Sequence, residues 1–179
     1  MADIIITNST EEETWKQVKK HLANNNLSDS ILIKDKGFSI LIDIDIDLGG
    51  GFEGGLSTTQ LKSAIKADNN FRFAIHKKNL LDDVGKFFGM QDVTIGYKEF
   101  DDAFIIKTTD EKRIKEIFAD KNTRNTLKSM SHFTLSVEEG HNGSSLLEMY
   151  IEEATTDAAL LKKIYLAFYS VLLQINETA

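Results

Sequence analysis

Hydrophobic and polar residues alternate most regularly in the first third of the chain. Apolar residues occupy every second position from Phe38 to Leu48, shortly after the apolar run Ile31-Leu32-Ile33. A period of two is typical of a β-strand with one buried face. Asp35-Lys36-Gly37 separates the two runs and has the composition of a turn. The pattern therefore predicts a β-hairpin here.

Similar patterns predict the other strands, over residues 71–76, 93–95, 103–108, 133–138 and 146–152. The last two flank His141-Asn142-Gly143, and Asn-Gly is the strongest short signal for a hairpin. A second hairpin is therefore expected towards the end of the chain.

Apolar residues recur with helical spacing elsewhere. Ser9 to Glu13 can form capping boxes, and Trp15, Val18 and Leu22 then make one apolar face. The same reasoning predicts helices over 58–67, 80–88, 110–119, 122–130 and 158–175. Hairpins with helices between and around them favour the α+β class, with an antiparallel sheet, helices packed on one face and a long C-terminal helix.

The length of 179 residues suits one domain, 1–179. A glycine-rich loop at 49–55 is the one plausible seam in it. Such a seam would separate an N-terminal appendage, 1–55, from the core that follows.

Three aspartates, Asp43, Asp45 and Asp47, share the strand face opposite the isoleucines. Neighbouring members lie roughly 7 Å apart along a strand, so two could converge on one divalent cation, and three only if the strand bends. An EF-hand loop would need glycine where Leu48 stands and glutamate where Gly54 stands, so that motif fails. Two interpretations stay open: a solvated acidic face, or a metal site with the three aspartates as ligands.

Repulsion along this acidic stripe would be relieved by basic groups on a neighbouring strand. Arg72, His76 and Lys78 share one face of the next clear strand. We expect salt bridges from that face to the stripe if the two strands pair.

The segment Gly49 to Gly54 matches G-x-G-x-x-G after a strand. A dinucleotide-binding loop would open a helix at once, but Gly55 follows and the next helix signal begins near Ser57. The chain also lacks G-K-[ST] and the kinase motifs H-R-D and D-F-G. We therefore expect a flexible loop and no phosphate site.

The four histidines are His21, His76, His132 and His141. None lies three or four residues from another, so the helical zinc signature is missing. His21 falls at the end of a predicted helix, where a cation is favourable. No metal or catalytic role is expected for a single histidine.

Glu99, Asp101 and Asp102 form a second acidic cluster and could pair as catalytic carboxylates. They stand at the entrance to a predicted strand, where charged residues more often form a turn.

Composition excludes several classes of function. The net charge is −7, which opposes non-specific binding to nucleic acid or anionic lipid. The absence of cysteine removes disulfides, thiolate nucleophiles and cysteine-based zinc sites. The N-terminal sequence does not read as a signal peptide, and no apolar run reaches the roughly 20 residues of a membrane span. We predict a cytoplasmic protein without nucleic-acid or membrane partners.

Residues 71–175 resemble a recurring bacterial α+β domain of unknown function. The resemblance rests on Phe87-Phe88-Gly89-Met90, on the block Glu99 to Lys107 and on Asp110-Glu111. Similar blocks often belong to membrane-tethered chains, whereas no tether is recognised here. The resemblance implies a compact α+β fold and brings no catalytic residues with it.

Three functions remain as hypotheses. The first is a non-enzymatic cytoplasmic binding or interaction module, acting with a protein partner or as a homodimer. The second is a metal-dependent hydrolase or phosphate-handling enzyme that uses the aspartate stripe and a divalent cation, with Glu53 as base. The third is a carrier for a small apolar ligand held between the sheet and the last helix.

Overall fold

A computed structural model of the chain describes residues 2–7, 9–50, 55–65, 71–78, 89–139 and 145–177. Within these ranges it contains nine strands: β1 (Ile4–Thr7), β2 (Ser28–Asp35), β3 (Phe38–Asp45), β4 (Thr58–Ile65), β5 (Phe73–Lys77), β6 (Gln91–Val93), β7 (Phe104–Thr108), β8 (Phe133–Glu139) and β9 (Ser145–Ile151). The helices are α1 (Glu11–Leu22), α2 (Lys98–Asp101), α3 (Glu111–Ile117), α4 (Lys121–Ser129) and α5 (Ala158–Glu177).

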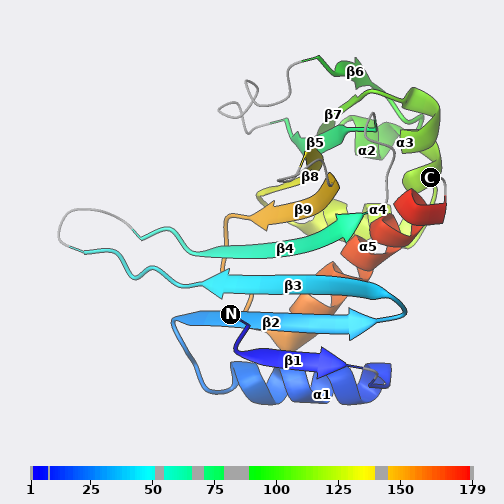
Figure 1. Cartoon of the computed structure of the whole chain (residues 1–179). Coiled ribbons are helices and arrows are strands. Elements are labelled where there is room, and N and C mark those ends of the chain that lie inside the picture. The colour runs from blue at the N-terminus through cyan, green and yellow to red at the C-terminus, as the bar shows by residue number, and fades with distance from the viewer. Residues whose placement is uncertain are drawn as a thin grey trace.

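All nine strands belong to one sheet, in the order β1-β2-β3-β4-β9-β8-β5-β7-β6 (Figure 1). β1 runs parallel to β2, and the other neighbours are antiparallel. The parallel pair is possible because α1 carries the chain back between the two strands. The α+β class is therefore confirmed, but the sequence did not predict β1, and this strand makes the sheet mixed.

The first predicted hairpin is confirmed. β2 and β3 pair from Ser28↔Asp45 to Asp35↔Phe38. The turn between them uses positive φ angles at Lys36 and Gly37, a conformation that glycine adopts at little cost. β8 and β9 also pair as an antiparallel hairpin, while the Asn142-Gly143 turn lies outside the described residues.

The helix predicted over 58–67 is wrong, because Thr58–Ile65 forms β4. Alternate residues of this strand are buried, and two of them, Thr59 and Ser63, are polar. The Thr59 hydroxyl donates to the Glu153 carbonyl (2.7 Å) and accepts from the Thr155 amide (2.8 Å). These bonds remove the cost of burying a hydroxyl. Burial therefore alternates along this strand, but hydrophobicity does not, because two of the buried residues are polar.

The remaining predicted helices correspond to α1, α3, α4 and α5, and the helix predicted over 80–88 falls outside the described residues. Thr10 caps α1 by accepting from the Glu13 amide (3.2 Å). α5 contacts α1, α3, α4 and β4. Figure 1 shows it passing diagonally behind β2 and β3 and ending near the helices of the second half of the chain.

The core lies between the inner face of the sheet and α5. On α5, the side chains of Phe168, Val171 and Leu172 have no exposed surface, and on the sheet the same holds for Ile42 and Leu61. α5 is long and apolar enough to cross a membrane by length and composition alone, with a mean hydropathy of 1.4. A helix at the centre of a core passes the same test, and α5 places its apolar stripe in this core.

The glycine-rich segment does not separate two sheets. β3 precedes it and β4 follows it, and the two strands pair directly, with Ile42 opposite Leu61. One core cluster includes residues from Ile6 to Ile175. Whether 1–55 can fold without the rest stays a prediction.

Candidate functional site

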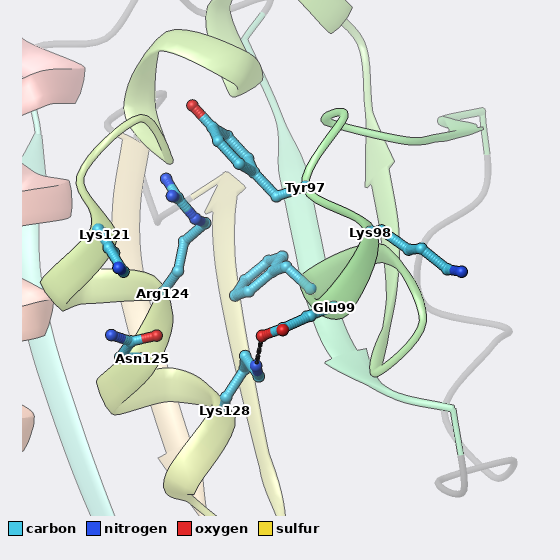
Figure 2. Close-up of a pocket in the computed structure, with 8 residues that line it drawn as sticks. Tyr97, Lys98, Glu99, Lys121, Arg124, Asn125 and Lys128 are labelled. Atoms are coloured by element: carbon cyan, nitrogen blue, oxygen red, sulfur yellow. Dashed lines mark hydrogen bonds and ion pairs between the residues drawn. The ribbon is translucent and has the colours of Figure 1, made fainter.

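A surface hollow of about 290 Å³ lies between α2 and α4, and we call it the α2–α4 hollow. Figure 2 shows the side chains that line it, with Lys98 directed away from the others. The lining combines two aromatic rings, four cationic side chains, one amide and one carboxylate, from Tyr97, Lys98, Glu99, Phe100, Lys121, Arg124, Asn125 and Lys128. Cationic groups are thus concentrated here, although the whole chain has a net charge of −7.

The α2 side of the hollow is held by a carboxylate at the end of the helix, which bonds to the turn that precedes the helix. Asp101 accepts hydrogen bonds from the amides of Ile95 (2.8 Å) and Gly96 (3.0 Å). Gly96 has a φ of 88°, in the left-handed region that favours glycine. The turn leads directly to Tyr97 at the rim, while Phe100 is buried below it. Asp101 therefore organises the turn that precedes α2, whereas Glu99 and Asp101 themselves lie in this helix and not in the turn expected there.

The α4 side is set by a capped helix. Asp120 is the N-cap, and its carboxylate accepts from the Thr123 amide (2.6 Å). This hydrogen bond is the main reason that the pKa of Asp120 lies below its usual value. Beyond the cap, Lys121, Arg124 and Lys128 recur at helical spacing and so share one face. The buried Thr123 and Leu127 anchor the helix to the core.

Arg124 joins three parts of the site. Its Nη1 donates to the carbonyls of Phe118 and Ala119 (both 2.6 Å), which stand at the C-terminal end of α3. Its guanidinium carbon lies 3.4 Å from the centroid of the Tyr97 ring, a cation–π contact. Arg124 thus fixes the position of Tyr97 and satisfies carbonyls that α3 itself cannot bond.

A carboxylate already occupies one edge of the hollow. The Glu99 Oε2 and the Lys128 Nζ are 2.6 Å apart, and Figure 2 shows this contact as a dashed line. The hydrogen bond from Lys128, followed by its charge, lowers the pKa of Glu99. Glu99 is largely exposed, so solvent weakens this pair. The contact nevertheless identifies a carboxylate as a group that this surface accepts.

The aspartate stripe is arranged differently. Asp43 lies on β3 and accepts from the Ser30 hydroxyl (2.6 Å), Asp45 is exposed at the end of β3, and Asp47 accepts from the Gly49 amide (2.8 Å). Within the described ranges, the three do not place three ligand atoms within 4.8 Å of one another. The predicted metal role of Asp43, Asp45 and Asp47 therefore gains no support from their geometry and stays a prediction.

The salt bridges to the stripe were expected only if β3 paired with β5, and this condition is not met. β3 lies between β2 and β4, so Asp43 faces Ser30 and Gln60 across the two ladders. His76, on β5, is buried with 2% of its surface exposed. Polar neutral residues, and not basic ones, therefore stand beside the acidic face.

The prediction that the second strand continues to Leu48 is also wrong. The strand ends at Asp45, and Leu48 is 76% exposed. Gly55 lies so close to the backbone of Asp47 and Gly49 that a Cβ at this position would collide with it. The close approach of these backbone segments therefore explains why residue 55 is a glycine. Residues 51–54, including Glu53, lie outside the described residues.

The remaining histidines fall in three settings. His132 is exposed just before β8, and His141 lies outside the described residues. His21, in the last turn of α1, places its Nε2 2.8 Å from the Oδ1 of Asp29. Together with Asp3 these two residues bring one ligand atom each within 4.8 Å of the others.

Sequence reasoning did not identify the α2–α4 hollow. One signal was available, because Lys121, Arg124 and Lys128 have helical spacing within a predicted helix. The partners on α2 could not be assigned from spacing, since more than twenty residues separate them from α4 and the turn at Gly96 decides where Tyr97 points.

The comparisons with known proteins inform the fold. No family model matches the chain, and no curated protein matches it. Among solved structures it is similar to one described as the crystal structure of the mycobacterial trehalose monomycolate transport factor A, TtfA. The TM-score is 0.52 with 9% sequence identity, and the match covers 90% of this chain and 95% of that one. At this identity the likeness shows a shared fold alone.

Proposed function

We propose that this protein is a non-enzymatic binding module whose α2–α4 hollow docks a short acidic segment of a partner protein. The observation that carries the proposal is that Lys121, Arg124 and Lys128 line one hollow together with Tyr97, on a chain that is acidic as a whole. A local cluster of positive charge attracts an anionic partner although the rest of the surface repels it.

The chemistry of the lining favours carboxylates on a peptide. Lysine and arginine form strong charge-assisted hydrogen bonds with carboxylates. Glu99 already makes such a bond with Lys128 inside the chain. The hydrogen bonds of Arg124 all come from Nη1, so its remaining N–H groups have no hydrogen-bond acceptor within the described parts of the chain. Tyr97 adds an aromatic surface of the kind enriched at protein interfaces.

Two alternatives have less support. A carrier would need space between the sheet and α5, and the facing side chains Leu61, Leu161 and Phe168 are packed there with no exposed surface. A hydrolase built on the stripe would need its carboxylates to converge, whereas Asp45 points to solvent and Asp43 and Asp47 bond to nearby serine and backbone groups.

The cytoplasmic location, the lack of nucleic-acid and membrane partners and a homodimeric state remain proposals that rest on composition and patterning.

The test is a titration with a hexaglutamate peptide, followed by backbone amide NMR. We expect saturable shifts in α4 and around Tyr97, weakened by salt because the contacts are exposed charges. Lys121→Glu should lower the affinity at least fivefold. Lys16→Glu is the matched control, because Lys16 is an exposed lysine on α1, at the opposite edge of the sheet.

Three results would count against the proposal. The wild type could show no saturable shifts, or Lys16→Glu could weaken binding as much as Lys121→Glu. Inorganic phosphate could produce the same shifts at the same concentration, which would assign the hollow to a small anion. Circular dichroism of each variant shows that loss of binding is not loss of folding.

A further inference from the structure

The second group of side chains that the fold assembles lies at the other edge of the sheet. Asp3 stands just before β1, His21 in the last turn of α1 and Asp29 near the start of β2. The parallel pairing of β1 with β2 brings them together, because α1 must return the chain to the same end of the sheet. The Asp3 amide donates to the Ser30 carbonyl (2.7 Å), and the Ser30 amide donates to Asp3 Oδ2 (2.8 Å).

We propose that Asp3, His21 and Asp29 bind one divalent transition-metal ion of the Zn²⁺ class. Each offers one ligand atom, and the three atoms lie within 4.8 Å of one another. Ligands at about 2.0–2.2 Å in a tetrahedral zinc site are roughly 3.3–3.6 Å apart. The distance between His21 Nε2 and Asp29 Oδ1 is 2.8 Å, which is shorter than this value, and none of the three ligand-atom distances exceeds 4.8 Å. Small rotations of the side chains would therefore admit an ion.

The imidazole of His21 supplies an independent observation. Its Nε2 is inaccessible to solvent and makes no hydrogen bond among the described residues. Asp29 Oδ1 lies 2.8 Å from it, which is an ion-pair distance, but the contact does not have the geometry of a hydrogen bond. Buried polar nitrogens are nearly always partnered. A metal ion bound to this nitrogen would satisfy it.

Burial and charge point the same way. The side chain of Asp29 is only 2% exposed, and a buried carboxylate needs a compensating charge. The Asn26 amide donates to its Oδ1 (3.0 Å), which helps but adds no charge. Two carboxylates and a neutral imidazole would balance a doubly charged cation. The C-terminal end of α1 adds its negative helix dipole.

A hollow of about 300 Å³ borders the proposed site at His21, and its other lining residues are Ile4, Gln17, Lys20 and Asn24. Zinc and related ions take three protein ligands and a water in open sites. Water entering through this hollow can complete the coordination. The exposed Lys20 is a competing cation at the rim and favours a moderate affinity.

The same residues could instead form an ion pair, with a proton on His21 in place of the metal. The metal site and the ion pair differ because only the first binds added metal, so a metal titration distinguishes them. Chelator-treated protein is titrated with Co²⁺, read by its visible absorption, and with Zn²⁺, read by the side-chain NMR signals of the histidines. We expect one equivalent to bind and the His21 signals to shift while those of His132 do not.

Three variants make the assignment specific. His21→Gln should lower the affinity at least tenfold, and Asp3→Asn, which keeps an oxygen acceptor for the Ser30 amide, at least fivefold. His132→Gln is the matched control, because His132 is exposed and distant from the three ligands in sequence and sheet order. Absence of binding in the wild type, unchanged binding in Asp3→Asn and His21→Gln, or loss of binding in His132→Gln would overturn the proposal.

Discussion

The protein carries two groups of acidic residues that look alike in composition and differ in surroundings. Asp43, Asp45 and Asp47 stand at every second position of the sequence, with Asp43 and Asp45 on β3 and Asp47 just beyond its end. Asp3 and Asp29 are far apart in sequence, and the fold places them with His21 around one point. A high density of acidic residues in a sequence is therefore a poor guide to a metal site. Side chains at alternate positions of a strand point in the same direction but stay roughly 7 Å apart, so they do not converge on one ion.

The largest expected difference between the two groups is in stability. Asp29→Asn should lower the free energy of unfolding by about 3 kcal/mol, because it removes the buried carboxylate that lies 2.8 Å from His21 Nε2 and breaks the ion pair that forms when no metal is bound. Urea unfolding of chelator-treated protein measures the change. The double variant His21→Leu with Asp29→Leu should recover much of the loss, since replacing both partners removes the buried charges. A loss below about 0.5 kcal/mol for Asp29→Asn would mean that the pair is solvated.

Asp35 provides a third setting for an acidic residue. It belongs to the same hairpin as the stripe, but it lies near Tyr165 and Tyr169. Burial, followed by the charges of Tyr169 and Asp35, raises the pKa of Tyr165, and burial and Asp35 also raise that of Tyr169. With a raised pKa in the folded state, the unfolded chain loses its phenolic proton first. Stability is then complete below the ordinary tyrosine pKa of 10.0 and falls as the pH rises above it.

Thermal unfolding between about pH 9 and about pH 11 tests this expectation. The wild type should lose stability over that interval, and Tyr165→Phe should flatten the decline. An equal slope in the two proteins would show that Tyr165 ionises as readily in the folded chain as in the unfolded one.

The smallest effect is expected on the stripe. Asp45→Asn should change the free energy of unfolding by less than about 0.5 kcal/mol, with a small gain from reduced repulsion. Asp45 is the informative position because it is exposed, whereas Asp43 accepts the Ser30 hydroxyl and Asp47 accepts the Gly49 amide. Urea unfolding in parallel with Asp29→Asn provides the contrast. A cost of more than about 1 kcal/mol for Asp45→Asn would give the stripe a structural or ligand-binding role.

Regular patterning made most of the fold predictable. The β2–β3 hairpin, the β8–β9 pair and α5 follow from alternation and helical spacing in long segments. β4 was misread because Thr59 and Ser63 are buried polar residues whose partners are distant in sequence. β1 has four residues, too few for its period to be recognised, and it depends on β2 for its hydrogen bonds.

The candidate sites were less predictable for a physical reason. The basic face of α4 could be inferred from helical spacing, but the position of Tyr97 depends on the turn that Gly96 and Asp101 make. The grouping of Asp3, His21 and Asp29 depends on the parallel strand, which was itself missed. A site built across elements becomes readable only when the order of the strands is known.

That order also constrains how the chain folds while it is being synthesised. β1 to β4 leave the ribosome early, yet the second edge of β4 pairs with β9, where Thr59 lies opposite Ile151. At about 5–20 residues per second, that edge stays open for several seconds until the late strand arrives. An open edge with alternating buried positions is a template for pairing with another chain. The nascent protein is therefore most vulnerable to aggregation in the interval between the synthesis of β4 and that of β9.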